Sequence, residues 1–149
     1  MNSKLRVTKR FVIDMAHALY GYDGPCKNIH GHTYHLAVTV FGAVDQNLNS
    51  PKLGMVVDFT DLKNIVNKEI VSQFDHALVL NRDAPYTKNE LITHEFEKVI
   101  LTNFQPSCEN LLLDFKNRIA DKLPANIQLF SIRLEETPTS YAEWFVSDN

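Results

Sequence analysis

The sequence predicts an α+β domain in which two strands, two amphipathic helices and two further strands follow one another along the chain. Three observations support this order. Runs rich in Val, Ile, Phe and Thr lie towards both ends, apolar residues recur at helical spacing in between, and polar or glycine-containing loops separate these segments. Because 149 residues fit one domain with a continuous core, we expect a single domain over residues 1–149.

The two N-terminal strands are expected at Leu5–Met15 and His32–Val44, where β-branched and aromatic residues predominate. The intervening segment, Leu19–Ile29, contains glycine and proline and is predicted to be a loop. A polar turn at Asp45–Lys52 follows the second run. The two runs are therefore predicted to pair as antiparallel strands.

The first helix is predicted at Thr60–Ser72, with Asp58 or Thr60 as N-cap. Its apolar face comprises Leu62, Ile65, Val66 and Ile70. The second helix is predicted at Cys108–Lys122, with Ser107 as N-cap. Its apolar face comprises Leu111, Leu112, Phe115, Ile119 and Leu123.

The C-terminal strands are expected at Ile127–Glu135 and Tyr141–Val146, separated by a Thr-Pro-Thr-Ser turn. The stretch between Asn81 and Gln105 is less regular. One short extra helix there would use Ile92, Phe96, Val99 and Ile100.

Composition and charge exclude several classes of protein. The net charge of −3 without a Lys/Arg block argues against nucleic-acid binding, although a small anionic substrate is compatible with it. No apolar run approaches the roughly 18 residues of a membrane helix, and the N-terminus lacks the apolar core of a signal peptide. With only Cys26 and Cys108 present, a reducing, cytoplasmic location is expected.

The strongest chemical pattern is His30-Gly31-His32, preceded by His17 at the end of the first strand. Side chains alternate along a strand, so His30 and His32 point the same way and can share one ion. An antiparallel neighbour can bring His17 to the same place. Three imidazoles without a fourth protein ligand are typical of a catalytic zinc, which keeps one position open. Ordinary polar strand residues are the alternative explanation.

Cys26 lies four residues before His30, close enough to bind the metal or to stand beside it. Asp75-His76 follows the first helix, and a carboxylate next to an imidazole suits acid–base chemistry, although adjacent residues often point apart. Glu135-Glu136 ends a predicted strand, where a carboxylate can accept two parallel N–H bonds from a planar ring. By themselves, these acidic positions also fit solvated turns.

Six short segments occur in a recognisable order. They are A-H at 16–17, C-x-x-x-H-G-H-x-Y at 26–34, V-V-D-F-x-x-L-K at 56–63, F-D-H closely followed by L-N at 74–81, P-S-C-E-N at 106–110 and E-E-T at 135–137. Together they resemble the 6-pyruvoyl-tetrahydropterin synthase / 6-carboxy-tetrahydropterin synthase family, from Arg10 to Phe145. The three residues between Cys26 and His30 resemble the bacterial 6-carboxy branch, which feeds queuosine synthesis.

The resemblance implies conversion of 7,8-dihydroneopterin triphosphate, a small pterin triphosphate, to 6-carboxytetrahydropterin. It also implies a role for each matching residue. The implied Zn²⁺ ligands are His17, His30 and His32. The implied catalytic groups are the Cys26 thiol and the Asp75–His76 proton relay. The implied pterin-binding residues are Glu136 (with Glu135 the less favoured anchor), Ser107, Cys108 and Glu109. Cys108 departs from the Thr/Ser-rich pattern of relatives, and a helix cap with a small buried Cys explains this segment equally well.

The fold implied by the resemblance is the tunnelling (T-fold) type, an antiparallel four-stranded sheet with two main helices on one face. Three such sheets join into a barrel, and two barrels stack, so the implied partner is the chain itself in a hexamer, a dimer of trimers. Relative to compact bacterial members, the chain carries an insertion at about 82–105 without an assigned function; a change to a subunit interface and a change to the pocket entrance are the two options. Two alternatives remain: a 6-pyruvoyl-tetrahydropterin synthase, and a non-catalytic zinc-stabilised binding module with Cys26 as fourth ligand.

Overall fold

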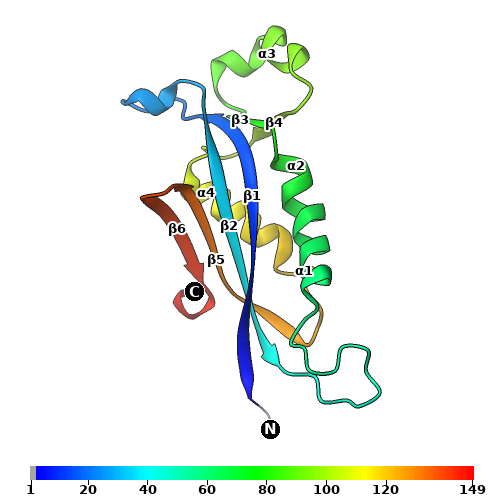
Figure 1. Ribbon diagram of the computed structural model, residues 1–149. Coiled ribbons are helices and arrows are strands. Elements are labelled where there is room, and N and C mark those ends of the chain that lie inside the picture. Colours follow the sequence, from blue (N-terminus) through cyan, green and yellow to red (C-terminus); the bar gives the residue numbers. More distant parts are fainter. Residues whose placement is uncertain (1–2) are drawn as a thin grey trace.

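The computed structural model describes residues 3–149, in which six strands form one curled, mixed sheet in the order β4-β3-β1-β2-β5-β6. The strands are β1 (Lys4–Ala18), β2 (His30–Ala43), β3 (Leu78–Asn81), β4 (Val99–Thr102), β5 (Ile127–Thr137) and β6 (Ser140–Phe145). The long β1–β2 ribbon, visible as the curved centre of Figure 1, is antiparallel, as predicted. Strands β5 and β6 extend the sheet in antiparallel fashion beyond β2.

The predicted four-stranded antiparallel sheet is wrong in strand number and in direction. Strand β3 pairs parallel with the end of β1, and β4 pairs parallel with β3. Val99 and Ile100, assigned to an extra helix from the sequence, lie in β4; the α-helix in this stretch, α3, spans Glu90–Glu95. This run forms a strand because it is rich in β-branched residues and because its backbone N–H and C=O groups can hydrogen-bond to the otherwise exposed edge of β3.

The two main helices form where helical spacing predicts them. Helix α1 (Phe59–Val66) continues through a π-turn, η2 (Asn67–Val71), into α2 (Ser72–Phe74), and the Asp58 carboxylate caps it by accepting the Thr60 amide hydrogen at 2.8 Å. Helix α4 spans Cys108–Ile119, with Ser107 as N-cap, and ends before the predicted Lys122. The short 3₁₀ helices are η1 (Pro25–Lys27), η3 (Pro85–Lys88) and η4 (Val146–Asp148).

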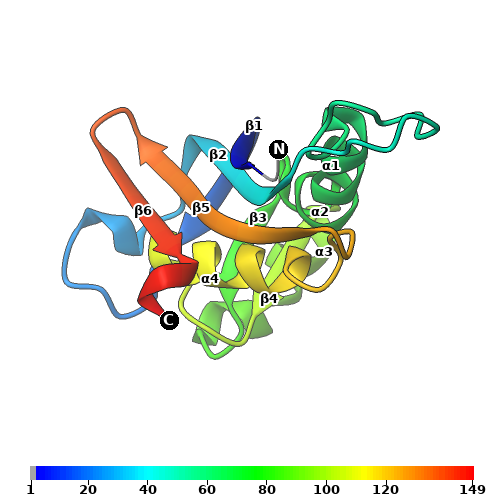
Figure 2. The same ribbon diagram turned by 90° about the horizontal axis from the view of Figure 1, so that it is seen from below.

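Both main helices pack on the same side of the sheet, which we call the closed face; the uncovered side is the open face (Figures 1 and 2). Alternation along β1 sends Ile13, Met15 and His17 to the closed face and Val12 and Asp14 to the open face. Fully buried closed-face side chains include Tyr34, Leu36, Phe74, Phe115 and Leu134. Burying each large apolar side chain contributes about 1.5–3 kcal/mol, so this core holds the strand ends, and the residues they carry, in place.

Candidate metal centre

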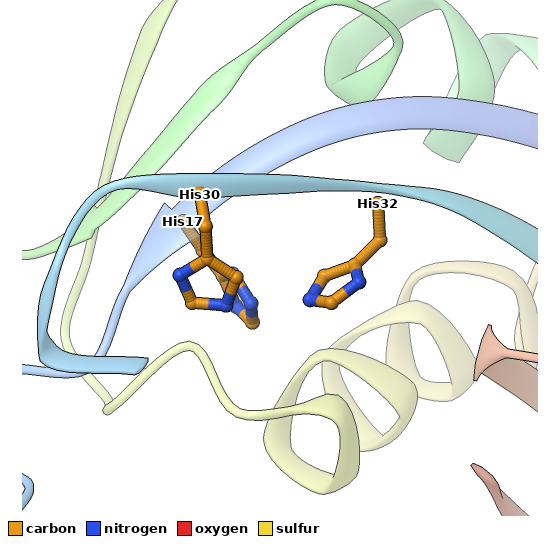
Figure 3. Close-up of side chains that lie close together, drawn as sticks. All are labelled: His17, His30 and His32. Carbon is orange, nitrogen blue, oxygen red and sulfur yellow. The ribbon is translucent and has the colours of Figure 1, made fainter. Parts of the chain in front are cut away.

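Three histidines from the β1–β2 ribbon converge on the closed face. His17, at the end of β1, lies directly opposite His30 at the start of β2, and His32 follows on the same side of that strand. Figure 3 shows the three rings pointing to one side, towards the segment that leads into α4. Each can offer one ring nitrogen, and these atoms lie within 4.8 Å of one another. The structure thus positions three histidines to bind a metal ion.

Two backbone carbonyls set the orientation of these rings. His17 Nδ1 lies 2.6 Å from the Pro106 carbonyl oxygen, and His30 Nδ1 lies 2.8 Å from the Asn28 carbonyl oxygen. A carbonyl only accepts, so each Nδ1 carries the hydrogen and each Nε2 keeps a free lone pair. This outer-shell arrangement is typical of metal-binding histidines.

The remaining nitrogens fit a cation. His30 Nε2 and His32 Nε2 are buried and have no hydrogen-bond partner among residues 3–149, which is costly for a polar atom unless a ligand occupies the site. Burial lowers the pKa of His17 and of His32, although Glu136 opposes this effect at both. Both imidazoles are therefore held in the neutral form that a metal requires.

Tyr34 belongs to this site, although the sequence analysis assigned it no role. Its phenol is fully buried, and its hydroxyl oxygen lies 3.4 Å from His17 Nε2. Burial, followed by the charge and hydrogen bonding of Glu136, raises the pKa of Tyr34, so the phenol stays neutral and can donate to that carboxylate. The period of two that places His30 and His32 together also places Tyr34 on the closed face, and that was the available signal.

The two adjacent glutamates at the end of β5 lie in different surroundings. The Glu136 carboxylate approaches the histidines, with Oε1 3.7 Å from His32 Nε2. The Glu135 carboxylate instead lies 3.7 Å from Arg133 and lines an open-face hollow with Arg10 and His35. Alternation along the strand explains the separation, and it favours Glu136 over Glu135 for any contact with a molecule bound at the histidines.

Cys26 sits in η1, on the loop between β1 and β2, and is half-buried. Its carbonyl oxygen accepts the Leu19 amide hydrogen at 2.9 Å, which folds the loop back beside the end of β1. Its sulfur is not among the atoms clustered within 4.8 Å, which come from the three histidines alone. The geometry therefore does not place Cys26 as a fourth ligand.

Asp75 and His76 form a pair within the chain, with Asp75 Oδ2 2.9 Å from His76 Nδ1. His76 has a φ of 63°, and this left-handed turn lets adjacent side chains meet. Burial alone would raise the pKa of Asp75, but a hydrogen bond from the Asp14 amide and the nearby His76 together outweigh it and hold the pKa below its usual value.

The Asp75–His76 pair does not join the three histidines. His76 is 77% exposed in its side chain. Most of the strand residues that border a hollow with it alternate with the histidines and so belong to the open face (Asp14, Ala16, Gly31 and Thr33), although Met15 and His32 border it too. In this structure the pair and the metal centre lie on opposite faces of one sheet.

The start of α4 borders the metal centre through backbone and side-chain atoms. The Ser107 hydroxyl accepts the Asn110 amide hydrogen as N-cap, and Glu109 is exposed in the first turn. The Cys108 thiol donates to the Leu134 carbonyl at 3.4 Å. Burial, with the charges of Glu136 and Glu109, raises the pKa of Cys108 to about 12, so this thiol stays protonated and unreactive at neutral pH.

Comparison with known proteins identifies the family. The model of the 6-pyruvoyl tetrahydropterin synthase family matches residues 6–145. The chain belongs to this family. It is therefore a tetrahydropterin synthase family enzyme that acts on a small molecule, and the resemblance found in the sequence motifs is confirmed. No helix within residues 3–149 is long and apolar enough to span a membrane.

Relatives in the tetrahydropterin synthase family carry names from both branches. A 6-carboxy-5,6,7,8-tetrahydropterin synthase of Haemophilus influenzae is 38% identical over 93% of this chain and 97% of its own. The protein of that name in Rickettsia bellii is 32% identical over 93% and 99%. A 6-pyruvoyl tetrahydrobiopterin synthase of Poecilia reticulata is 35% identical over 76% of this chain and 65% of its own. The relatives named for the 6-carboxy reaction thus match along a larger share of both chains.

Solved structures show the same fold. An uncharacterised protein of Wolinella succinogenes superposes with a TM-score of 0.77, 18% identity and coverage of 97% of this chain and 99% of that one. The 6-pyruvoyl tetrahydropterin synthase of Caenorhabditis elegans superposes with a TM-score of 0.68, 22% identity and coverage of 97% and 96%. At these identities the likeness speaks for the fold alone.

Proposed function

We propose that the chain is a zinc-dependent 6-carboxytetrahydropterin synthase. It would convert 7,8-dihydroneopterin triphosphate and water to 6-carboxy-5,6,7,8-tetrahydropterin, acetaldehyde and triphosphate, a step towards queuosine and related 7-deazaguanines. One observation carries the proposal: two buried, unpartnered imidazole nitrogens face a third histidine beside the Glu136 carboxylate. The relatives named for this reaction support it.

The closed-face residues would bind and orient the substrate. A zinc ion held by His17, His30 and His32 would supply Lewis-acid polarisation of the hydroxyl groups on the substrate side chain. The Glu136 carboxylate would accept two N–H bonds from the planar edge of the pterin ring. The buried Tyr34 phenol, which donates to this carboxylate, would hold it in position.

The proton transfers would use two groups outside the metal centre. The Cys26 thiolate would take a proton from the substrate side chain at its sulfur. His76 Nε2 would be the second acid–base atom, since Asp75 engages Nδ1. Because His76 lies on the open face, we infer that it serves the site of a neighbouring copy, as in a homo-oligomer that is a dimer of trimers.

The product of the reaction tests the proposal. Purified, zinc-loaded protein is incubated with 7,8-dihydroneopterin triphosphate, and the products are analysed by mass spectrometry. A 6-carboxy product with released acetaldehyde supports the proposal. A 6-pyruvoyl product would assign the sister reaction named for the Poecilia relative. Fully metal-bound protein without turnover would instead favour the non-catalytic binding module.

The shared-site proposal has a separate test. Cys26→Ala and His76→Ala should each bind zinc but lack turnover. If one site uses Cys26 of one copy and His76 of another, co-assembled mixtures of the two variants contain some intact sites and recover activity. Mixtures that stay inactive after confirmed subunit exchange would place both groups in one chain.

A further inference from the structure

The loop that carries Cys26 is held mostly by short-range bonds. Within residues 19–29, backbone hydrogen bonds join Tyr22 to Leu19, Lys27 to Gly24 and Asn28 to Pro25. The Leu19–Cys26 bond closes the loop at 2.9 Å. Bonds of this kind shape the loop locally, but they do not fix its place against the rest of the domain. Contacts from outside the loop must do so.

Two residues from the 82–105 segment, the predicted insertion, meet this loop at Tyr20. The Tyr86 ring packs edge-on against the Tyr20 ring, with centroids 6.0 Å apart and an interplanar angle of 84°. Gln105 Nε2 donates to the Tyr20 carbonyl oxygen at 2.7 Å. The Gln105 side chain is itself bound, since its Oε1 accepts from Asn81 Nδ2 at 3.3 Å. Residues near the start and at the end of the segment thus both contact Tyr20.

Burial and hydrogen bonds next to Tyr86 fix the backbone conformation of this part of the segment. Ala84 is fully buried, and the buried Thr87 hydroxyl shares its one hydrogen between the carbonyl oxygens of Arg82 and Ala84, at 2.9 and 2.7 Å. These bonds fasten the turn of η3 that holds Tyr86. The Tyr86 hydroxyl is buried and has no partner in the part of the chain that the structure describes, so the ring makes the contact and the hydroxyl adds nothing to it.

We propose that the 82–105 segment positions the Cys26 loop, with Tyr86 as a positioning residue that acts through Tyr20. This inference rests on the proposed role of the Cys26 thiol. Ring packing at Tyr20 and the hydrogen bond from Gln105 restrict the position of the loop. The backbone hydrogen bond between Leu19 and Cys26 ties Cys26 to the residue next to Tyr20, so the thiol is held in position as well. A small misplacement of a reacting group costs up to about a hundredfold in rate. Loss of the Tyr86–Tyr20 contact should therefore lower the turnover rate more than the stability of the fold.

The test compares three variants of the full-length, zinc-loaded protein. Tyr86→Ala removes the ring, Tyr86→Phe keeps the ring and removes only the unpartnered hydroxyl, and Leu91→Ala is the control on the same segment, at a side chain that is 65% exposed. The measurements are zinc content, kcat and KM separately, and the rate of Cys26 alkylation by iodoacetamide, resolved from Cys108 by peptide mass spectrometry.

Tyr86→Ala should lower kcat by about tenfold to a hundredfold, with KM changed by less than about twofold, and should change the Cys26 alkylation rate at unchanged zinc content. Tyr86→Phe and Leu91→Ala should match the wild type in every measurement. The proposal is overturned if Tyr86→Ala leaves alkylation and kcat unchanged, or if Tyr86→Phe or Leu91→Ala loses as much.

Two provisions keep the test decisive. If Tyr86→Ala does not fold, Gln105→Ala removes the bond to the Tyr20 carbonyl and should give the same changes. If wild-type protein shows no synthase activity, the proposed function fails, while the alkylation rates still decide whether the segment positions Cys26.

Discussion

The closed and open faces of one sheet differ in chemistry although they alternate residue by residue. On the closed face, the apolar core ends in His17, His30 and His32, with Tyr34 and Glu136 beside them. The open face near the same strand ends carries the half-buried Asp75 beside the exposed His76, and Glu135 with Arg133 farther along.

The difference shows how burial separates two kinds of titratable group. On the closed face, burial lowers the pKa of His17 and raises that of Tyr34, so both groups are neutral and suited to holding a ligand. On the open face, the lowered pKa of Asp75 holds it as a carboxylate, and it pairs with the exposed imidazole of His76. One sheet therefore carries buried, neutral groups on one face and a charged carboxylate beside an exposed imidazole on the other.

The largest expected effect compares His32 with His35, three residues later on β2 and on the open face. His32→Ala should weaken zinc binding by more than about a hundredfold, because it removes one of the three proposed ligands. His35→Ala should leave zinc affinity unchanged. Chelator competition measures both, and equal losses would contradict the separation of the two faces.

The next comparison concerns stability. Leu36→Ala, in the closed-face core, should lower the free energy of unfolding by about 2–5 kcal/mol, because it leaves a cavity among packed side chains. Val12→Ala, at an open-face side chain that is 52% exposed, should cost no more than about 0.5 kcal/mol. Denaturant unfolding measures both. A large cost at Val12 would show that the open face is covered in solution.

The adjacent glutamates provide a smaller and sharper test. Glu136→Gln should raise KM for the pterin substrate by about tenfold, since it replaces a charge-assisted pair of hydrogen bonds, and should leave the zinc content intact. Glu135→Gln, whose carboxylate faces Arg133, should change KM by less than about twofold. Steady-state kinetics decides between them, and the reverse result would move the pterin anchor to Glu135.

The smallest effect is in pH dependence. The pKa values of His17 and His32 are lowered from the ordinary value of 6.5, so these imidazoles stay mostly neutral until the pH falls below 6.5. A proton and the metal compete for the same lone pair of the neutral imidazole, and this competition becomes appreciable only as the pH approaches the pKa. Zinc affinity should therefore fall by less than about threefold between pH 7.5 and 6.5 and decline steeply below that. A tenfold loss by pH 6.5 would contradict the burial effect at the site.

Much of the site could be predicted from the sequence because it depends on local backbone geometry. The period of two along β2 puts His30 and His32 on one face, and helical spacing together with Asp58 and Ser107 defines where the main helices begin. These features need only neighbouring residues. The pairing of β1 with β2, which brings in His17, follows from two long strand runs joined by one loop.

Other features were decided only by the tertiary structure. The parallel strands β3 and β4, the Pro106 carbonyl on His17 and the placement of Asp75–His76 on the open face each join segments distant in the sequence. Such contacts result from the packing of the whole chain, in which many weak interactions together outweigh the preferences of a short segment. The sequence by itself determined which groups are present and how neighbours alternate; the packed domain decided which of them meet.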